Sequence, residues 1–390
     1  MTGFPPIDPP PRVLLGPGPS AVPASVLRAL GLPTVGHLDR YFLEIGDQVG
    51  ALLREVFETK NELTLPISGT GSAGMEAVLA NLLEPGDRAL IGVHGVFGTR
   101  MAEVARRCGA EVVEVTGDWG RALAAEDFRK AAQGRGMKLV CAVHAETSTG
   151  VLQPLEPLRE VADELGALFV VDAVTSLGGL SVAVDARRLD AVYSGTQKCL
   201  SCPPGLAPLT FSPAAAAALA RRRTPVQSWY LDLTLVTRYW GSERLYHHTA
   251  PINMIYGLHE ALRLVHEEGL EARFRRHRLH AAALWAGLEA LGLALLVPAA
   301  ERLPTLTTVR IPEGVDDLKA RNLLLDEFGV EIGGGLGPLK GKAWRIGLMG
   351  ASADRRNVNA CLCALRAALA AQRYPAPDPI PAADAVYGAG

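Results

Sequence analysis

Short apolar runs alternate with amphipathic stretches between Leu63 and Phe211, and this alternation constrains the fold more than any other feature of the sequence. The apolar runs are LTLPI, ALIGV (89–93), EVVEV (111–115), KLVCAV (138–143), ALFVVD (167–172), AVYS (191–194) and APLTF (207–211). Helical stretches lie between them, and two of these end at Gly109 and Gly166, where a C-terminal glycine cap is expected. Strands that alternate with helices form mainly parallel sheets. The sequence therefore predicts a large, doubly wound α/β domain.

The pattern changes after Thr249. A long helical pattern (253–291) is followed by TLTTVRI, a helix near 316–328, VEIGG, WRIGLMG and a helix near 355–372, which together predict a smaller α+β domain. The last residues are rich in Pro and Ala without periodicity, which predicts a mobile tail. The expected organisation is an N-terminal arm (1–20), a large domain (21–250), a helical connection with a small C-terminal domain (251–373), and the tail (374–390).

Charge and cysteine usage indicate a small-molecule partner and a reducing environment. The 39 Lys and Arg residues nearly balance 41 Asp and Glu residues, so neither nucleic acid nor a membrane surface is expected as a partner. No apolar run approaches the roughly 20 residues that span a bilayer. The six cysteines are scattered along the chain, which favours a cytoplasmic location. Cys199 and Cys202 form a lone CxxC motif, and no metal site is predicted from it.

The segment GTGSAG (69–74) follows the apolar run LTLPI and opens a helical stretch. Its G-x-G-x-x-G spacing also occurs in dinucleotide-binding folds, but those require an acidic residue at the end of the next strand. Here that run ends in His94 and Gly95. The turn is better interpreted as a cradle for one phosphate, formed by backbone N–H groups with help from Thr70 and Ser72. A purely structural turn is the alternative.

An acid and an amine follow two successive apolar runs. Asp172 ends the run LFVVD, and a carboxylate buried there needs a cationic partner such as a protonated pyridine nitrogen. Lys198 follows the run AVYS and precedes a rigid Pro-Pro-Gly turn, a position typical of a catalytic amine. A pyridoxal ring requires these two groups at its nitrogen and its aldehyde. A structural lysine is the alternative.

Several segments together carry a resemblance to a known family. They are GPGPS (16–20), the glycine turn with NLLEPGD (81–87), HAETSTGVLQP (144–154), VDAVTSLGG, YSGTQK and YHHTAP (246–251). From LLGPGPS to RIGLMG (345–350), the chain resembles the alanine–glyoxylate and serine–pyruvate aminotransferases. These are class V aminotransferases of fold-type I, with a large domain built on a seven-stranded, mainly parallel sheet. The resemblance implies pyridoxal 5'-phosphate as the cofactor.

The resemblance assigns roles around the cofactor. Lys198 becomes the lysine that bonds to the cofactor's aldehyde, and Asp172 becomes the partner of its pyridine nitrogen. Gly71, Ser72 and Gln197 become ligands on the phosphate side. The first two lie in the glycine turn, and the third lies next to the lysine.

The remaining roles concern the ring, the substrate and a second subunit. The resemblance makes Phe97 the aromatic plate stacked on the ring and Thr147 a hydroxyl beside it. Arg345 becomes the guanidinium that grips the substrate carboxylate, which suits its planar fork. Tyr246 and Thr249 reach the phosphate of the neighbouring subunit in this family. The resemblance therefore implies a homodimer with shared active sites.

The implied reaction is a ping-pong transamination between a small amino acid, alanine or serine, and a 2-oxo acid, glyoxylate or pyruvate. The sequence does not decide between the donors or between the acceptors. Desulfuration, epimerisation and a non-catalytic relative are alternatives. Desulfuration needs a mobile cysteine, whereas Cys361 and Cys363 lie within a helical pattern. A non-catalytic relative is disfavoured because a buried, unpaired Asp172 would be costly.

Overall fold

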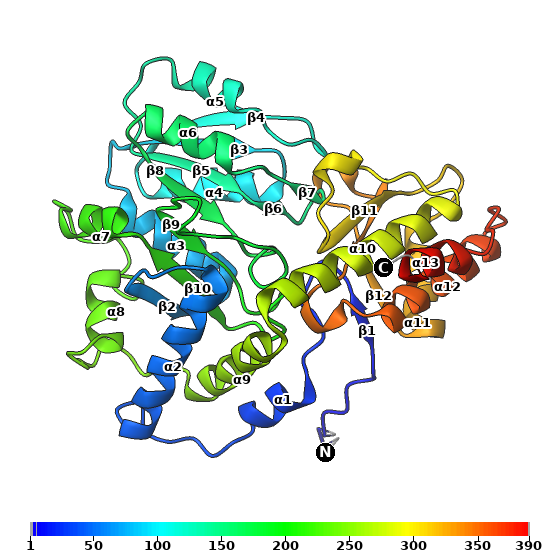
Figure 1. The fold of residues 1–390 in the computed structure, drawn as a ribbon, viewed down its shortest axis with the longest axis horizontal. Helices are drawn as coiled ribbons and strands as arrows, with labels where there is room; N and C mark the ends of the chain where they lie inside the picture. Colours follow the sequence, from blue (N-terminus) through cyan, green and yellow to red (C-terminus); the bar gives the residue numbers. More distant parts are fainter. Residues whose placement is uncertain (1–2, 5, 389–390) are drawn as a thin grey trace.

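The large domain is built on a seven-stranded sheet of order β2-β10-β9-β8-β5-β3-β4. The computed structural model describes residues 3–4 and 6–388 of the chain (Figure 1). The strands are β2 (Leu63–Ser68), β3 (Arg88–Val93), β4 (Glu111–Thr116), β5 (Leu139–Val143), β8 (Leu168–Asp172), β9 (Ala191–Tyr193) and β10 (Leu206–Phe211). Only β10 runs antiparallel to its neighbours in this sheet. The predicted apolar runs and the mainly parallel sheet are confirmed.

Helices cover both faces of this sheet, because successive strand residues alternate between two apolar cores. One core joins the sheet to α2 (Arg40–Phe57), α5 (Ala125–Ala132), α6 (Glu156–Glu164) and α9 (Ile252–Glu268). The other joins it to α3 (Gly71–Leu82), α4 (Val96–Arg107), α7 (Pro213–Ala220) and α8 (Leu233–Trp240). Gly109 and Gly166 follow α4 and α6 with φ of 79° and 62°, so both predicted glycine positions are confirmed. The domain is doubly wound, as the sequence predicts.

The small domain combines a four-stranded sheet of order β1-β12-β13-β11 with helices. Its strands are β1 (Val13–Leu15), β11 (Leu306–Arg310), β12 (Val330–Gly334) and β13 (Ala343–Gly347). Its helices are α10 (Leu270–Ala290), α11 (Asp317–Phe328) and α12 (Arg355–Ala371), and α1 (Ala24–Leu30) follows the first strand. β1 lies parallel to β12, so part of the predicted N-terminal arm belongs to this sheet (Figure 1). Short pieces complete the fold: β6 (Ala145–Glu146), β7 (Val151–Leu152), η1 (Ala299–Glu301), η2 (Gly337–Leu339) and η3 (Gly350–Ser352).

The end of the chain differs from the predicted mobile tail. Residues Ile380–Gly388 form a helix, α13, which packs against α10 (Figure 1). Ala383 is completely buried there, and the hydroxyl of Tyr387 lies 2.9 Å from Nδ1 of His280. Ile380, Ala383 and Tyr387 follow helical spacing, which the surrounding prolines hide in the sequence. The tail is therefore corrected to an ordered helix, and residues 389–390 lie outside the described residues.

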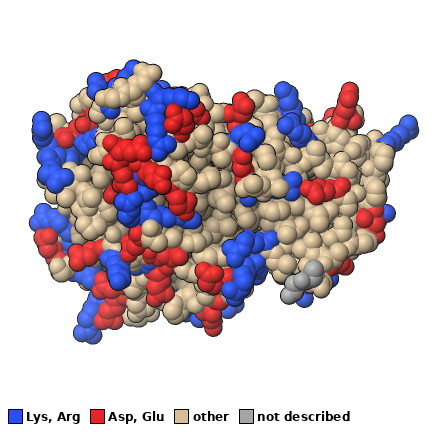
Figure 2. All heavy atoms as spheres, turned by 45° about the horizontal axis from the view of Figure 1, so that its top comes forward, with Lys and Arg blue, Asp and Glu red and all other residues tan. Residues whose placement is uncertain are grey.

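The surface carries charges of both signs. On the face shown in Figure 2, Lys and Arg side chains are interspersed with Asp and Glu side chains, and no broad patch of one sign covers this face. Among the described residues, no helix is both long enough and apolar enough to cross a membrane.

Candidate active site

Asp172 lies at the carboxyl end of β8, beside the end of β9. The two strands pair in parallel, and Asp172 is opposite Tyr193. The Tyr193 hydroxyl donates to Oδ2 of Asp172 at 2.8 Å, and the backbone N–H of Val174 donates to Oδ1 at 2.9 Å. Burial raises the pKa of Asp172 to about 6, although both donors oppose this shift. A nearby cation would therefore stabilise the ionised form strongly.

Lys198 follows β9 and is 8% exposed. Burial lowers the pKa of its amine to about 8, and the positive charge of Arg345 acts in the same direction. The amine donates to the backbone carbonyl of Pro17, which lies just after β1. A Cβ at Gly18 would lie 2.5 Å from Nζ, and Gly18 has a φ of 110°, so this position requires glycine. The N-terminal segment thus covers the lysine, a contact that the sequence did not predict.

The glycine turn brings together three of the predicted phosphate-side residues. Gly71 opens α3, and a Cβ there would lie 3.6 Å from the Cα of Gly195. The amide oxygen of Gln197 is buried without a hydrogen-bond partner among the described residues, and a Cβ at Gly195 would lie 2.7 Å from it. Ser72 is exposed at the helix start and accepts a hydrogen bond from Arg100 at 3.1 Å.

This turn fits a phosphate group. Thr70 precedes α3 but makes no side-chain cap within the described part of the chain, so the first N–H groups of the helix are available to an anion. The Gln197 side chain beside this turn can donate to a phosphate through its NH2 group, whereas its oxygen, which has no partner among the described residues, can only accept. Arg100 adds a positive charge at this helix start that the sequence did not single out.

Phe97 lies at the start of α4 and Thr147 lies just after β6. The buried carboxylate of Glu146 joins these two segments by hydrogen bonds. Phe97 is in the first turn of α4, and its N–H donates to Oε2 of Glu146 at 3.3 Å. Ser148 donates to the same side chain from its hydroxyl and its N–H. Burial raises the pKa of Glu146 despite these donors. The hydroxyl of Thr147 lies 2.5 Å from that of Thr175. Glu146 therefore fixes the start of α4, and the sequence did not reveal this role.

Arg345 is on β13 of the small domain and points toward the large domain. Its Nε donates to the Gly334 carbonyl at 2.8 Å, and its Nη1 donates to the Thr147 carbonyl at 3.2 Å. Burial lowers its pKa to about 10, and Glu146 opposes this shift. Among the described residues, no carboxylate oxygen lies within 4 Å of its guanidinium nitrogens. A buried guanidinium of this kind would gain strongly from a ligand carboxylate.

Tyr246 and Thr249 lie apart from these side chains, between α8 and α9. Tyr246 is 60% exposed, and its ring centroid lies 5.1 Å from that of His37. Thr249 is also exposed. Across the described residues, neither side chain takes part in a hydrogen bond within the chain. Their surroundings within one chain therefore leave both side chains free for a contact with another molecule.

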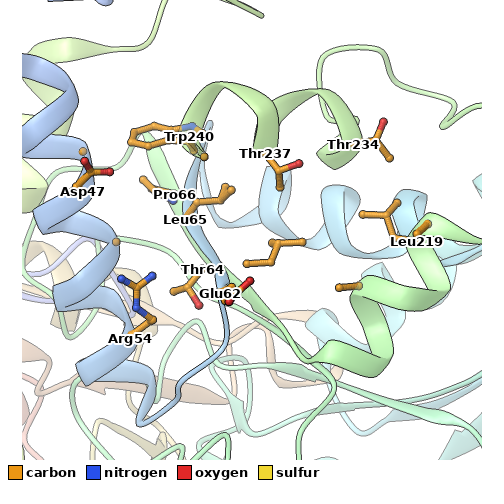
Figure 3. A pocket seen from close by; sticks show the side chains of 16 residues that line it. Asp47, Arg54, Glu62, Thr64, Leu65, Pro66, Leu219, Thr234, Thr237 and Trp240 are labelled. Carbon is orange, nitrogen blue, oxygen red and sulfur yellow. The ribbon is translucent and has the colours of Figure 1, made fainter. Parts of the chain in front are cut away.

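A cavity of about 710 Å³ lies along the edge strand β2 (Figure 3). Arg54 and Asp47 of α2 border it, and Thr237 and Trp240 of α8 border it as well (Figure 3). None of the predicted site residues lines it. This cavity is therefore separate from the acid and the amine at the strand ends.

Comparisons with known proteins identify the family of this chain. The family model described as Aminotransferase class-V matches residues 14–347. The alanine–glyoxylate aminotransferase of Callithrix jacchus is 44% identical over 93% of this chain and 89% of its own length. The crystal structure of the ureidoglycine–glyoxylate aminotransferase of Bacillus subtilis superposes with a TM-score of 0.96, at 43% identity, over 98% of this chain and 99% of that one. The alanine–glyoxylate aminotransferase of a Nostoc species gives a TM-score of 0.92 at 49% identity, over 94% and 97% of the two chains. The chain therefore belongs to the class V aminotransferase family, and its cofactor is pyridoxal 5'-phosphate.

Proposed function

We propose that this aminotransferase moves an amino group from alanine or serine to glyoxylate or pyruvate in a ping-pong cycle. The observation that carries the proposal is the convergence of Asp172, Lys198 and Arg345, an acid, an amine and a carboxylate clamp drawn from two domains. Relatives with more than 40% identity are named for glyoxylate as one substrate, which favours glyoxylate as the acceptor.

The residues around the strand ends can hold the cofactor. We assign its phosphate to the start of α3, with Gly71, Ser72 and Gln197, and its ring to the space beside Phe97 and Thr147. When bound, the cofactor supplies an aldehyde that captures an amino group and a ring that accepts electrons from the Cα–H bond. The ionised carboxylate of Asp172 would stabilise a proton on the ring nitrogen.

Lys198 performs the proton transfers in this proposal. Its lowered pKa of about 8 leaves part of the amine neutral near physiological pH, as a nucleophile and a general base require. The neutral amine would take the proton from the substrate Cα and deliver it to the carbon that carried the aldehyde of the cofactor. Such a positioned base typically contributes about 10²–10⁴-fold in rate. The backbone carbonyl of Pro17 accepts from the amine and holds it near the site.

Desulfuration is a weaker alternative. Cys361 is completely buried in α12, and Cys363 lies on the same helix. Neither belongs to a loop that could carry a thiol to the substrate. Burial also raises the pKa of Cys361 to about 12, which disfavours its thiolate.

The function is tested by absorbance and by a matrix of substrates. The purified protein should be yellow, and its visible band should bleach when alanine or serine is added. Steady-state rates for these donors, each paired with glyoxylate and with pyruvate, identify the preferred pair. A colourless protein that cannot be reconstituted with pyridoxal phosphate would contradict the proposal, and so would bleaching without any oxo-acid product.

Replacing Arg345 with alanine should raise KM for donor and acceptor alike, since both bear a carboxylate. Hydrogen bonds to a charged group contribute about 1.5–3 kcal/mol, so the expected increase is roughly 10- to 150-fold. Steady-state kinetics with each substrate measures it. Arg310 is exposed on the neighbouring strand β11, and Arg310→Ala serves as the control. An unchanged KM in the Arg345 variant would remove this residue from the site.

The stability of the cofactor-free protein should depend on Asp172. The folded pKa of about 6 lies above the ordinary value of 3.8, so the protonated form is stabilised on folding. This contribution is fully present below pH 3.8 and is lost as the pH rises through 6. The shift corresponds to about 3 kcal/mol. Denaturant unfolding at pH 4 and pH 7.5 should therefore show Asp172→Asn gaining much more stability relative to the original chain at pH 7.5 than at pH 4. If the variant and the original chain differ in stability by the same amount at both pH values, the difference does not come from the ionisation of Asp172.

We also propose that the protein is a homodimer in which Tyr246 and Thr249 complete the phosphate site of the partner. Their exposure within one chain supports this proposal. Chains carrying Lys198→Ala and chains carrying Tyr246→Ala with Thr249→Ala should each be poorly active alone. Unfolding and refolding the two together should restore activity, because one of the two mixed sites has all its residues intact. A mixture that stays as inactive as its components would contradict a shared site.

A further inference from the structure

One face of α10 lies at the junction of the two domains (Figure 1). Arg273, Arg276 and His277 share this face, because residues three and four apart lie together on a helix. Arg273 and His277 are buried, whereas Arg278 of the same helix is exposed. The first three side chains contact the backbone of Cys199, directly after Lys198, and of the turn that begins at Gly350, five residues after Arg345. We call these three residues, together with Glu268, the α10 clamp.

Arg273 holds the lysine side of the site. Its Nη2 donates to the carbonyl of Cys199, the residue after Lys198, at 2.5 Å. Its Nε donates to the carbonyl of Gly178 at 2.8 Å, and its Nη1 forms an ion pair with Glu268 at 2.5 Å. All three nitrogens of the Arg273 guanidinium therefore have a hydrogen-bond or ion-pair partner. Such a fork fixes the direction of the Cys199 carbonyl, which a lysine ammonium could not reproduce.

Arg276 and His277 bind the backbone of the turn that begins at Gly350, after the strand that carries Arg345. Arg276 donates to the carbonyls of Gly350 and Ala353 at 2.9 and 2.7 Å, and it shares Glu268 with Arg273. The N–H of Gly350 donates to Nε2 of His277 at 2.9 Å. Burial lowers the pKa of this histidine to about 3, so its ring is neutral and accepts the bond.

The two backbone segments also touch each other directly. The N–H of Ala351 donates to the hydroxyl of Ser201 at 2.7 Å, which joins the loop after Lys198 to the turn after β13. A Cβ at Gly350 would lie 2.7 Å from the Cys199 carbonyl oxygen, so there is little room for one segment to slide past the other.

We infer that the α10 clamp sets the separation between the Lys198 amine and the Arg345 guanidinium, with Arg273 as its main positioning residue. An α-amino acid must engage both groups at once, and its amino and carboxylate groups are joined through a single carbon. A displacement of about 1 Å in such a site can cost 10²-fold in rate. The inference rests on the proposed roles of Lys198 and Arg345.

The test compares two amines on the pyridoxal-phosphate-loaded protein. 2-Methylalanine has both groups of an amino acid but no Cα hydrogen, so it binds without turnover, whereas methylamine has no carboxylate. Titrations followed by visible absorbance give Kd for each, and the ratio of the two constants measures simultaneous engagement of both ends of the site. The variants are Arg273→Lys, which keeps the charge but loses the fork, and Arg278→Lys as the matched exposed control.

We expect Arg273→Lys to reduce the preference for 2-methylalanine by roughly tenfold or more, with Kd for methylamine changed less than twofold. Arg278→Lys should leave both constants unchanged. A lowered melting temperature with an unchanged preference would overturn the inference, because the clamp would then act only in stability.

Ser201→Ala provides a second, milder variant in case Arg273→Lys does not fold. It removes the bond to Ala351 and a 3.4 Å contact with the Ser20 hydroxyl, and it should shift the preference in the same direction by a smaller factor. An unchanged preference here would likewise overturn the inference. If the original protein itself shows no preference for 2-methylalanine, the proposed role of Arg345 fails first, and the inference falls with it.

Discussion

Replacing Lys198 with alanine is expected to lower kcat by at least about 10⁴-fold, because one side chain supplies both the covalent bond to the cofactor and the proton transfers. General acid–base catalysis alone accounts for about 10²–10⁴-fold of this loss. The fold should remain intact, since the change removes a buried amine whose desolvation opposes its charge. Steady-state rates, the visible spectrum and circular dichroism together measure the outcome.

The control for this experiment is Lys130→Ala, which removes an exposed lysine of α5. That variant should keep its rate and its colour. In the Lys198 variant, the absorbance of free pyridoxal phosphate should appear in place of the band of the lysine-bound form. A residual rate within 10²-fold of the original would contradict the catalytic assignment of Lys198.

Asp172→Asn should lower kcat by roughly 10²–10⁴-fold. Removing one partner of a buried ion pair costs about 3–5 kcal/mol, and each 1.36 kcal/mol is tenfold in rate. The asparagine oxygen can still accept from the Val174 N–H, and its NH2 group can donate to the Tyr193 hydroxyl oxygen, so the side chain should keep its position. Single-turnover measurements of the bleaching of the visible band report this effect directly, because they isolate the chemical step.

Tyr193→Phe separates charge from hydrogen bonding in this prediction. It removes the donor to Oδ2 but leaves the carboxylate, so it should raise the pKa of Asp172 further and change kcat far less than Asp172→Asn does. Equal losses in the two variants would show that the hydrogen bond, not the negative charge, is what the ring requires.

The sequence predicted the large domain well because each of its elements is specified locally. Runs such as ALIGV and LFVV are apolar throughout, as strands covered on both faces must be, and the intervening helices end at glycines with positive φ. The same locality underlies the prediction of Asp172 and Lys198 as site residues. Each ends or follows such a run, and the carboxyl ends of neighbouring parallel strands meet at one edge of the sheet.

Several features that the sequence did not predict depend on contacts between distant segments. The pairing of β1 with β12 joins Leu14 to Glu331, and nothing near residue 14 signals it. The same holds for the Pro17 carbonyl beside Lys198 and for Arg273 beside Cys199. The tail was missed for a different reason, since its prolines break the local pattern while α10 supplies the surface on which α13 forms.

The pairing of β1 with β12 also sets an order of events during synthesis. The central sheet has all its strands once Phe211 has been made, whereas β1 must wait for a partner more than 300 residues further along the chain. At 5–20 residues per second, that wait lasts roughly 15–60 s. Until then the Gly16–Ser20 segment cannot be held over Lys198 by the small sheet. The segment over Lys198 is therefore held in place only after most of the chain has been made.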